Sequence, residues 1–224
     1  MGDHAGRAIP ASLKRLGISD AEMERHIAWD IGVEGLGALL AEQLNACFVR
    51  QTYSRLVIDC NRRPGAAGSV AVESDGCAVP GNRGLGPADI QARLDEIYTP
   101  YQDAIAAELD RREGRRTVFI ALHSFTPSMQ GFDRPWLYGV LHREDSPYSQ
   151  AVLARLRALI GEAAGDNQPY SMDGTDNTVP LHVDPRGLEY LELEVRQDLI
   201  ADAAGQARVA AFLAPVLTGA LGAQ

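Results

Sequence analysis

The sequence lacks the features that mark several classes of protein. Its three cysteines, Cys47, Cys60 and Cys77, have no C-x-x-C spacing, which argues against a disulfide framework and a cysteine zinc site. No apolar stretch approaches the ~20 residues that a membrane helix needs, and no signal-peptide apolar region is present. Basic clusters are absent and the formal charge is −9, so nucleic acid and anionic membranes are poor partners. We therefore expect a cytoplasmic protein with reduced thiols.

The composition is that of an ordinary globular protein, with 46% hydrophobic and 23% charged residues among 224. This length favours one domain, 1–224, with one well-buried core. Strands alternate with helices along the chain, which predicts an α/β fold whose mainly parallel sheet lies between helices. The expected strands are 56–58, 118–122, 136–141 and 190–196. The expected helices are 20–26, 33–44, 90–97, 101–109, 152–160 and 206–221. The segments 66–86 and 165–184 are polar and irregular, and are expected to be loops.

The chain is organised around the segment Val118–Gly131. Its first five residues are apolar, with β-branched and aromatic members, and they predict a strand buried on both faces. His123 and Ser124 follow directly, and Pro127 ends any regular element. A histidine past the carboxyl end of a buried strand is where open α/β sheets place ligand chemistry. The alternative is a histidine that only bonds a loop carbonyl.

Other polar residues at expected strand ends and loops could form a metal site. Two histidines and one carboxylate suit a catalytic zinc ion, with the fourth position left for water. His4, Asp30 and His123 could supply this set from three separate segments, although Asp30 could instead be the N-cap of the helix that follows. His142, which also follows an expected strand, is a weaker ligand candidate.

A glutamate and an Asn-Arg pair could complete such a site. Glu194 could take a proton from the attacking water and pass it to a leaving nitrogen. Arg62, with Asn61, could hold a substrate carboxylate through a bidentate contact. The alternatives are that Glu194 lies on a solvated strand face and that Arg62 is a surface turn residue. In a central strand, however, Glu194 would have to pair or serve a site.

Several motifs together resemble the N-formylglutamate amidohydrolase family, and they cover nearly the whole chain in the expected order. The motifs are Asp3-His4-Ala5-Gly6 with Ile9-Pro10, His26-Ile27-Ala28-Trp29-Asp30-Ile31-Gly32, Ser54-Arg55-Leu56-Val57-Ile58-Asp59-Cys60-Asn61-Arg62, His123-Ser124-Phe125-Thr126-Pro127, Gly131 with Arg134-Pro135-Trp136, Gly165-Asp166-Asn167 with Pro169-Tyr170, and Glu194-Val195-Arg196-Gln197-Asp198-Leu199-Ile200.

The resemblance implies a zinc-dependent exopeptidase-like fold, a three-layer α/β/α sandwich with a mostly parallel mixed sheet, related to metallocarboxypeptidases and aspartoacylase-like enzymes. It implies hydrolysis of a small anionic N-acyl amino acid, with N-formyl-L-glutamate giving L-glutamate and formate as the type reaction. The alternatives are a related metallo-deacylase or carboxypeptidase-like peptidase, and a metal-free relative that acts as a binding module. The implied roles are zinc ligation by His4, Asp30 and His123, general-base catalysis by Glu194, and binding of the substrate carboxylate by Asn61 and Arg62. We further expect Arg55 to assist catalysis and Ser124, His182 and Arg196 to bind substrate.

The sequence departs from the family pattern in two places. Relatives usually carry a strand before the Asp-His-Ala motif, whereas Met1 here stands almost against it, so either the start is truncated or the sheet lacks that strand. Relatives also tend to have Pro-Tyr-His where this chain has Pro100-Tyr101-Gln102. The acyl group, the substrate side chain and the oligomeric state do not follow from the sequence.

Overall fold

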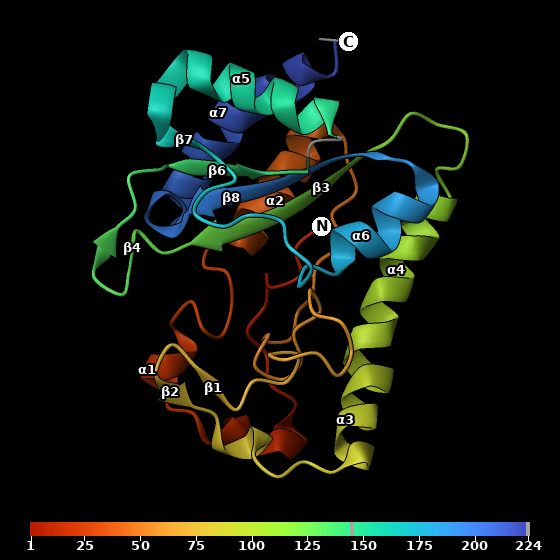
Figure 1. The fold of residues 1–224 in the computed structure, drawn as a ribbon, viewed down its shortest axis with the longest axis vertical. Helices are drawn as coiled ribbons and strands as arrows, with labels where there is room; N and C mark the ends of the chain where they lie inside the picture. The colour runs from red at the N-terminus through yellow and green to blue at the C-terminus, as the bar shows by residue number, and fades with distance from the viewer. Residues whose placement is uncertain (144–145, 223–224) are drawn as a thin grey trace.

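The structure is a computed structural model that describes residues 1–143 and 146–222. Within these residues the central sheet has four strands in the order β3-β8-β6-β7 (Figure 1). Strands β3 and β8 are parallel, as are β6 and β7, whereas β6 runs antiparallel to β8. The predicted fold class, α/β with a mixed and mostly parallel sheet, is confirmed. The strands are β3 (Val118–Phe125), β8 (Glu189–Arg196), β6 (Tyr138–Leu141) and β7 (Ala164–Asp166).

Helices cover both faces of this sheet, because alternate strand residues point to opposite faces. On one face, Leu122 and Leu193 pack with three helices in one buried apolar cluster. On the other face, Phe119 and Tyr190 belong to a second cluster with two further helices. The helices of the first face are α2 (Val33–Leu44), α5 (Pro147–Ile160) and α7 (Ala203–Ala220). Those of the second are α4 (Thr99–Asp110) and α6 (Thr178–Val183).

The remaining elements are short and lie mostly in the loop-rich half below the sheet in Figure 1. They include two hairpins and a run of helical turns that leads into α4. No helix in the described parts of the chain is long and apolar enough to cross a membrane. The elements are α1 (Asp20–Met23), α3 (Pro87–Arg93), the π-helical η3 (Leu94–Tyr98), β1 (Glu73–Ser74), β2 (Cys77–Ala78), β4 (Ser128–Met129), β5 (Phe132–Asp133), and the 3-10 segments η1 (Ala11–Gly17), η2 (Pro80–Asn82), η4 (Gly161–Ala163), η5 (Asp184–Arg186) and η6 (Gln197–Leu199).

The start of the chain lies against the sheet. The backbone N–H of Leu122 in β3 donates to the carbonyl of Met1, with an N–O distance of 2.9 Å. Gly2 then exchanges two backbone hydrogen bonds with Val49 and Gln51, each 3.0 Å long. A single bridge therefore stands where relatives are expected to carry a strand, and it brings His4 close to the carboxyl end of β3.

Several predicted elements differ from the observed ones. The strand predicted at 56–58 is wrong: these residues are buried but form a turn, in which Val57 N–H donates to the Ser54 carbonyl at 2.9 Å. The gap expected between the helices 90–97 and 101–109 is absent, because α3, η3 and α4 follow one another directly. Pro100 lies in the first turn of α4, directly after the π-helical η3. The segment 165–184, expected to be a loop, contains α6 and the end of β7.

Candidate active site and metal centre

Three buried side chains from separate segments converge beside the carboxyl end of β3. His4, Asp30 and His123 each offer one ligand atom, and these three atoms lie within 4.8 Å of one another. Their residues are 3–4% exposed. His4 follows the N-terminal bridge, Asp30 precedes α2, and His123 belongs to β3. The structure thus brings together the three residues that the sequence proposed as metal ligands.

Local structure holds Asp30 in place for this role. Its backbone N–H donates to the His4 carbonyl at 2.8 Å, which ties the two ligand segments together. The N-cap of α2 is Gly32, not Asp30, so the carboxylate is free to face the histidines. Gly32 has a φ of 82°, and a Cβ there would lie 2.2 Å from the Ile200 carbonyl oxygen. A glycine is therefore needed at this turn, and the alternative role of Asp30 as a helix cap is excluded.

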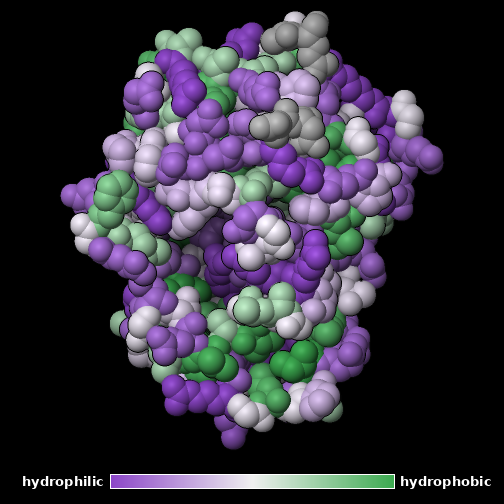
Figure 2. Space-filling view, in the orientation of Figure 1, coloured by the Kyte–Doolittle hydropathy of each residue, from purple (hydrophilic) through white to green (hydrophobic). Residues whose placement is uncertain are grey.

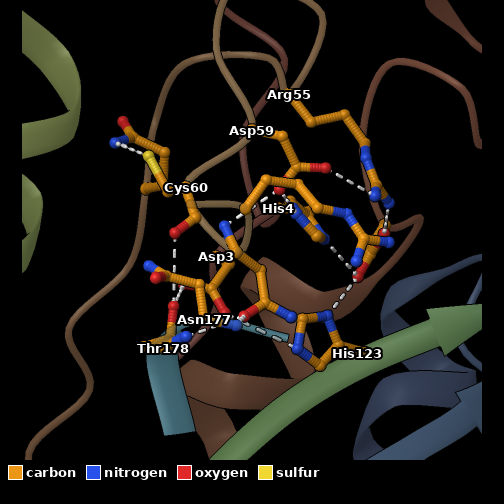
Figure 3. Close-up of polar contacts among 12 residues, drawn as sticks. Asp3, His4, Arg55, Asp59, Cys60, His123, Asn177 and Thr178 are labelled. Carbon is orange, nitrogen blue, oxygen red and sulfur yellow. Dashed lines mark hydrogen bonds and ion pairs between the residues drawn. The ribbon is translucent and has the colours of Figure 1, made fainter. Parts of the chain in front are cut away.

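Each of the two imidazoles has a carboxylate near its Nε2 atom and faces Asp30 with its Nδ1 atom. His4 Nε2 donates to Asp59 Oδ1 at 2.7 Å, and His123 Nε2 lies 3.6 Å from Asp3 Oδ2 (Figure 3). Both Nδ1 atoms face the same oxygen of Asp30, at 3.5 Å from His4 and 2.9 Å from His123. A carboxylate behind a histidine fixes its tautomer and orientation, which is the usual outer shell of a zinc ligand.

Unpaired buried atoms show that the site fits a metal ion. His4 Nδ1, which faces Asp30, is buried and has no hydrogen-bond partner among the described residues. His123 Nε2 and Asp3 Oδ2 are also buried and unpaired there, and they face each other 3.6 Å apart on the opposite side of the His123 ring. Buried polar atoms without partners are rare unless a ligand or ion completes them. Two imidazole nitrogens and a carboxylate oxygen are the donor set of an open, catalytic zinc site. The donors present therefore suit zinc.

The charges of the three ligands are strongly coupled. Burial alone would raise the pKa of Asp30, but the two histidines hold it well below its usual range. Burial likewise opposes a charge on His123, yet Asp30 raises the pKa of that imidazole to about 10. In His4 the nearby Asp59 and Asp30 outweigh burial and Arg55, and the pKa is raised. The cluster thus attracts positive charge at its centre, as a cation site must.

Two glutamates of β8 line the same cavity. Glu194 pairs with His123 in the β3–β8 register, and it is 6% exposed. Its Oε2 is buried without a partner, and burial raises its pKa to about 7. Glu192 lies two residues earlier on the same strand face and is 4% exposed, with its pKa raised to about 8 by burial. The alternative of a solvated strand face is therefore wrong for both glutamates.

The arginine and the Asn-Arg pair also reach the cavity. Arg55 Nη2 donates to Asp59 Oδ2 at 2.8 Å, and its Nη1 lies 3.5 Å from Asp30 Oδ1. Asn61 Oδ1 accepts the backbone N–H groups of Asn177 and Thr178, at 3.0 and 2.9 Å, and this fixes the start of α6. Its Nδ2 donates to Asp176 Oδ1 at 3.4 Å. Arg62 is half-buried beside it and donates to the Thr175 hydroxyl.

The other predicted substrate contacts separate into two groups. Ser124 lines the cavity, but its hydroxyl donates to the Ile31 carbonyl at 3.0 Å. His182 lies outside the cavity lining: its Nε2 donates to Gln102 Oε1 at 2.7 Å, and burial lowers its pKa to about 4. Arg196 also lies outside the lining and pairs with Asp198 at 2.8 Å. The structure therefore does not bring His182 and Arg196 to the site, because helix α6 and η6 hold them in other bonds.

The weaker ligand candidate, His142, belongs to a different part of the molecule. Its Nε2 lies 3.0 Å from Asp166 Oδ1, and it is not near the three converging ligands.

The cavity has a volume of about 610 Å³ and opens on the hollowed, mainly hydrophilic face seen in Figure 2. That volume exceeds what a formylated amino acid needs. Its lining includes residues that the sequence did not single out for a role. Asp59 lines the cavity, and Asp3 lies outside the lining behind His123; both stand in the quoted motifs, and Asp3 directly precedes the ligand His4. The other missed lining residues are Arg134, Tyr170 and Asp176.

Fold and site together define a class: an α/β protein whose sheet carries, at one strand end, two histidines and a carboxylate beside a buried glutamate. The chain belongs to the N-formylglutamate amidohydrolase family, whose family model matches residues 1–201. The family is one of amidohydrolases, and membership supports hydrolysis of an N-formyl amino acid.

Two solved structures resemble the whole chain. The gene product Atu2144 from Agrobacterium tumefaciens is 37% identical, with a TM-score of 0.94 over 98% of this chain and 88% of that one. The N-formylglutamate amidohydrolase from Ralstonia eutropha JMP134 is 19% identical, with a TM-score of 0.73 over 98% of this chain and 91% of that one. At that identity the second likeness concerns the fold. In a search of curated proteins, none matches this chain.

Proposed function

We propose that residues 1–224 form one catalytic domain that hydrolyses N-formyl amino acids with zinc held by His4, Asp30 and His123. N-formyl-L-glutamate is the first candidate substrate. The observation that carries the proposal is the convergence of these ligands next to Glu194 in one cavity. Family membership supports the reaction class.

The ligand set suits the chemistry that an amide requires. Zinc, when bound, acidifies water and polarises a carbonyl group. Asp59 orients His4, and Asp3 stands behind His123, so that each imidazole presents Nδ1 to the common point. Such outer carboxylates hold the ligand geometry without touching substrate.

Glu194 is the proposed general base. Its unpaired Oε2 can accept a proton from water in the cavity and later deliver it to the nitrogen that leaves. Burial raises the pKa of Glu194 to about 7, which suits a group that must take and return a proton near neutral pH.

Arg55 and Arg62 have separate roles in this proposal. Arg55 lies against Asp30 and Asp59 at the metal site, where its positive charge can stabilise a developing oxyanion. Arg62 and Asn61 line the cavity next to α6, where they can bind the α-carboxylate of the amino acid.

Metal content and formate release test the proposal together. Purified protein should contain about one zinc per chain and should release formate from N-formyl-L-glutamate. His123→Ala should lose both zinc and activity, while His142→Ala, a histidine outside the site, should keep both. Activity on N-acetyl or N-succinyl amino acids in place of N-formyl ones would favour a related deacylase. Protein that binds no zinc and hydrolyses none of these compounds would overturn the proposal.

A further inference from the structure

Arg134 is a buried arginine that lines the cavity without a counter-ion. It follows the β4–β5 hairpin and is 8% exposed. Among the described residues it makes no ion pair with a carboxylate. A buried guanidinium is normally paired, because removing its charge from water is costly. Its place in the cavity wall therefore calls for an anion that the protein itself does not supply.

Contacts on three sides fix the orientation of Arg134. Its guanidinium carbon lies 4.9 Å from the ring centre of Tyr170 and 5.8 Å from that of Phe125. Nη1 donates to the Thr126 hydroxyl at 3.1 Å and to the Thr126 carbonyl at 3.3 Å. The Tyr170 side chain is a further hydrogen-bond neighbour of the guanidinium, but Nε and Nη2 have no carboxylate partner among the described residues. These two nitrogens form one edge of the guanidinium, which matches the two oxygens of a carboxylate.

The other arginines of the cavity are differently placed. Arg55 forms ion pairs with Asp59 and Asp30. Arg62 lies in the loop that carries Asp173 and Asp176, and its charge acts on both of those carboxylates. Arg134 alone among the lining arginines is without such a neighbour in the described structure. The segment 125–134, which forms its wall, adds no carboxylate to the lining.

We propose that Arg134 determines specificity by binding a second carboxylate, carried by the side chain of the substrate, while Arg62 and Asn61 bind the α-carboxylate. The inference rests on the proposed function and narrows its substrates to N-formyl amino acids with an acidic side chain. Arg134 offers Nε and Nη2 to this carboxylate, and its contacts with Thr126, Tyr170 and Phe125 hold the guanidinium in the cavity wall. This contact is noncovalent and involves no proton transfer.

The test compares N-formyl-L-glutamate with N-formyl-L-glutamine on zinc-loaded protein. The two substrates share size and α-carboxylate, and differ only in the side-chain charge. Arg134→Met should raise KM for the glutamate substrate, lowering kcat/KM roughly 10- to 100-fold, as expected for loss of a hydrogen-bonded charge. The glutamine substrate should change less than about threefold. Arg134→Lys should restore part of the preference, because it keeps the charge but not the fork.

A control variant separates this contact from net charge and folding. Arg111→Met removes one positive charge from an arginine whose side chain is 66% exposed and lies outside the cavity. It should leave the preference unchanged. An equal loss on both substrates in Arg134→Met would make Arg134 a structural or oxyanion residue. A wild-type protein with no preference for the glutamate substrate would also overturn the inference.

The inference and the proposed function can fail separately. If zinc-loaded protein hydrolyses neither substrate, the proposed function fails. Calorimetric binding of glutarate, compared with its monoamide glutaramate, then decides the role of Arg134. Tighter binding of glutarate that is lost in Arg134→Met supports the second carboxylate site. Equal binding of the two compounds, or no binding of either, refutes it.

Discussion

Replacing Glu194 by glutamine tests the central chemical assignment with little structural disturbance. The two side chains have the same shape, and the Glu194 Oε2 atom has no hydrogen-bond partner to lose. The fold and the zinc content should therefore be retained. What is lost is the ability to accept a proton, and general acid–base catalysis contributes roughly 100- to 10,000-fold. We expect kcat to fall by a factor in that range while KM changes little.

The pH dependence sharpens this prediction. A base must be ionised, so activity falls as pH drops through its pKa, which burial raises to about 7 in Glu194. From the ionised fraction alone, kcat/KM of the wild type should fall roughly 25-fold between pH 7.5 and pH 5.5. A bound cation would move this acid limb to lower pH without removing it. In Glu194→Gln the limb should be flat over the same range.

Glu192→Gln is the comparison, but it is not an inert control. Glu192 lies on the same strand face as Glu194 and is buried in the same cavity. Only Glu194 is the register partner of His123. Formate release should therefore fall much less in Glu192→Gln than in Glu194→Gln. Near-normal kcat in Glu194→Gln, loss of its zinc, or a larger loss in Glu192→Gln would refute the base assignment.

Three further predictions concern the surroundings of the site. Asp59→Asn should weaken zinc binding roughly 10- to 100-fold in a chelator competition, because it weakens the hydrogen bond that orients the His4 imidazole. An unchanged zinc affinity would contradict the orienting role of Asp59. Arg62→Ala should lower kcat/KM for substrates with a free α-carboxylate more than for the matching α-amides, and an equal loss would make Arg62 structural. In metal-free protein, Glu192→Gln should raise Tm at pH 9 but not at pH 4. A carboxyl whose pKa burial raises to about 8 favours the fold while protonated, and this contribution disappears as pH rises through that value.

The strands that build the site could be predicted from sequence because their patterns are strong. Val118–Phe125 begins with an uninterrupted apolar run, and Glu189–Arg196 alternates apolar and charged residues. The strand predicted at 56–58 was wrong because an apolar run indicates that residues are buried but does not by itself indicate a strand. Here the Ser54 hydroxyl donates to the Ala28 carbonyl at 2.7 Å and accepts the Leu56 N–H, which shapes a buried turn instead of a strand. Side-chain bonds of this kind depend on a partner distant in sequence, so local patterns do not reveal them.

The metal ligands could be proposed from residue types and motifs, but their geometry could not. Nothing in the spacing of positions 4, 30 and 123 brings them together. What joins them is the contact of Met1 with Leu122 and of Asp30 with the His4 carbonyl. The prediction that His182 binds substrate shows that a suggestive position in the sequence does not by itself place a residue in the site. Its place in the polar segment 165–184 was suggestive, yet its side chain bonds to Gln102 and stacks on Phe119.

Arg134 shows why some functional residues emerge only from the folded chain. In sequence it is one arginine of 20 and stands beside Asp133, an apparent partner. In the structure Asp133 is exposed whereas Arg134 is buried, and no ion pair joins them among the described residues. The unusual feature is the missing counter-charge, which is a property of the surroundings. The protein has a net charge of −9, and many carboxylates line its cavity. Arg134 is buried in the cavity wall and forms no ion pair with these carboxylates among the described residues. Its positive charge is therefore available to bind an anionic substrate.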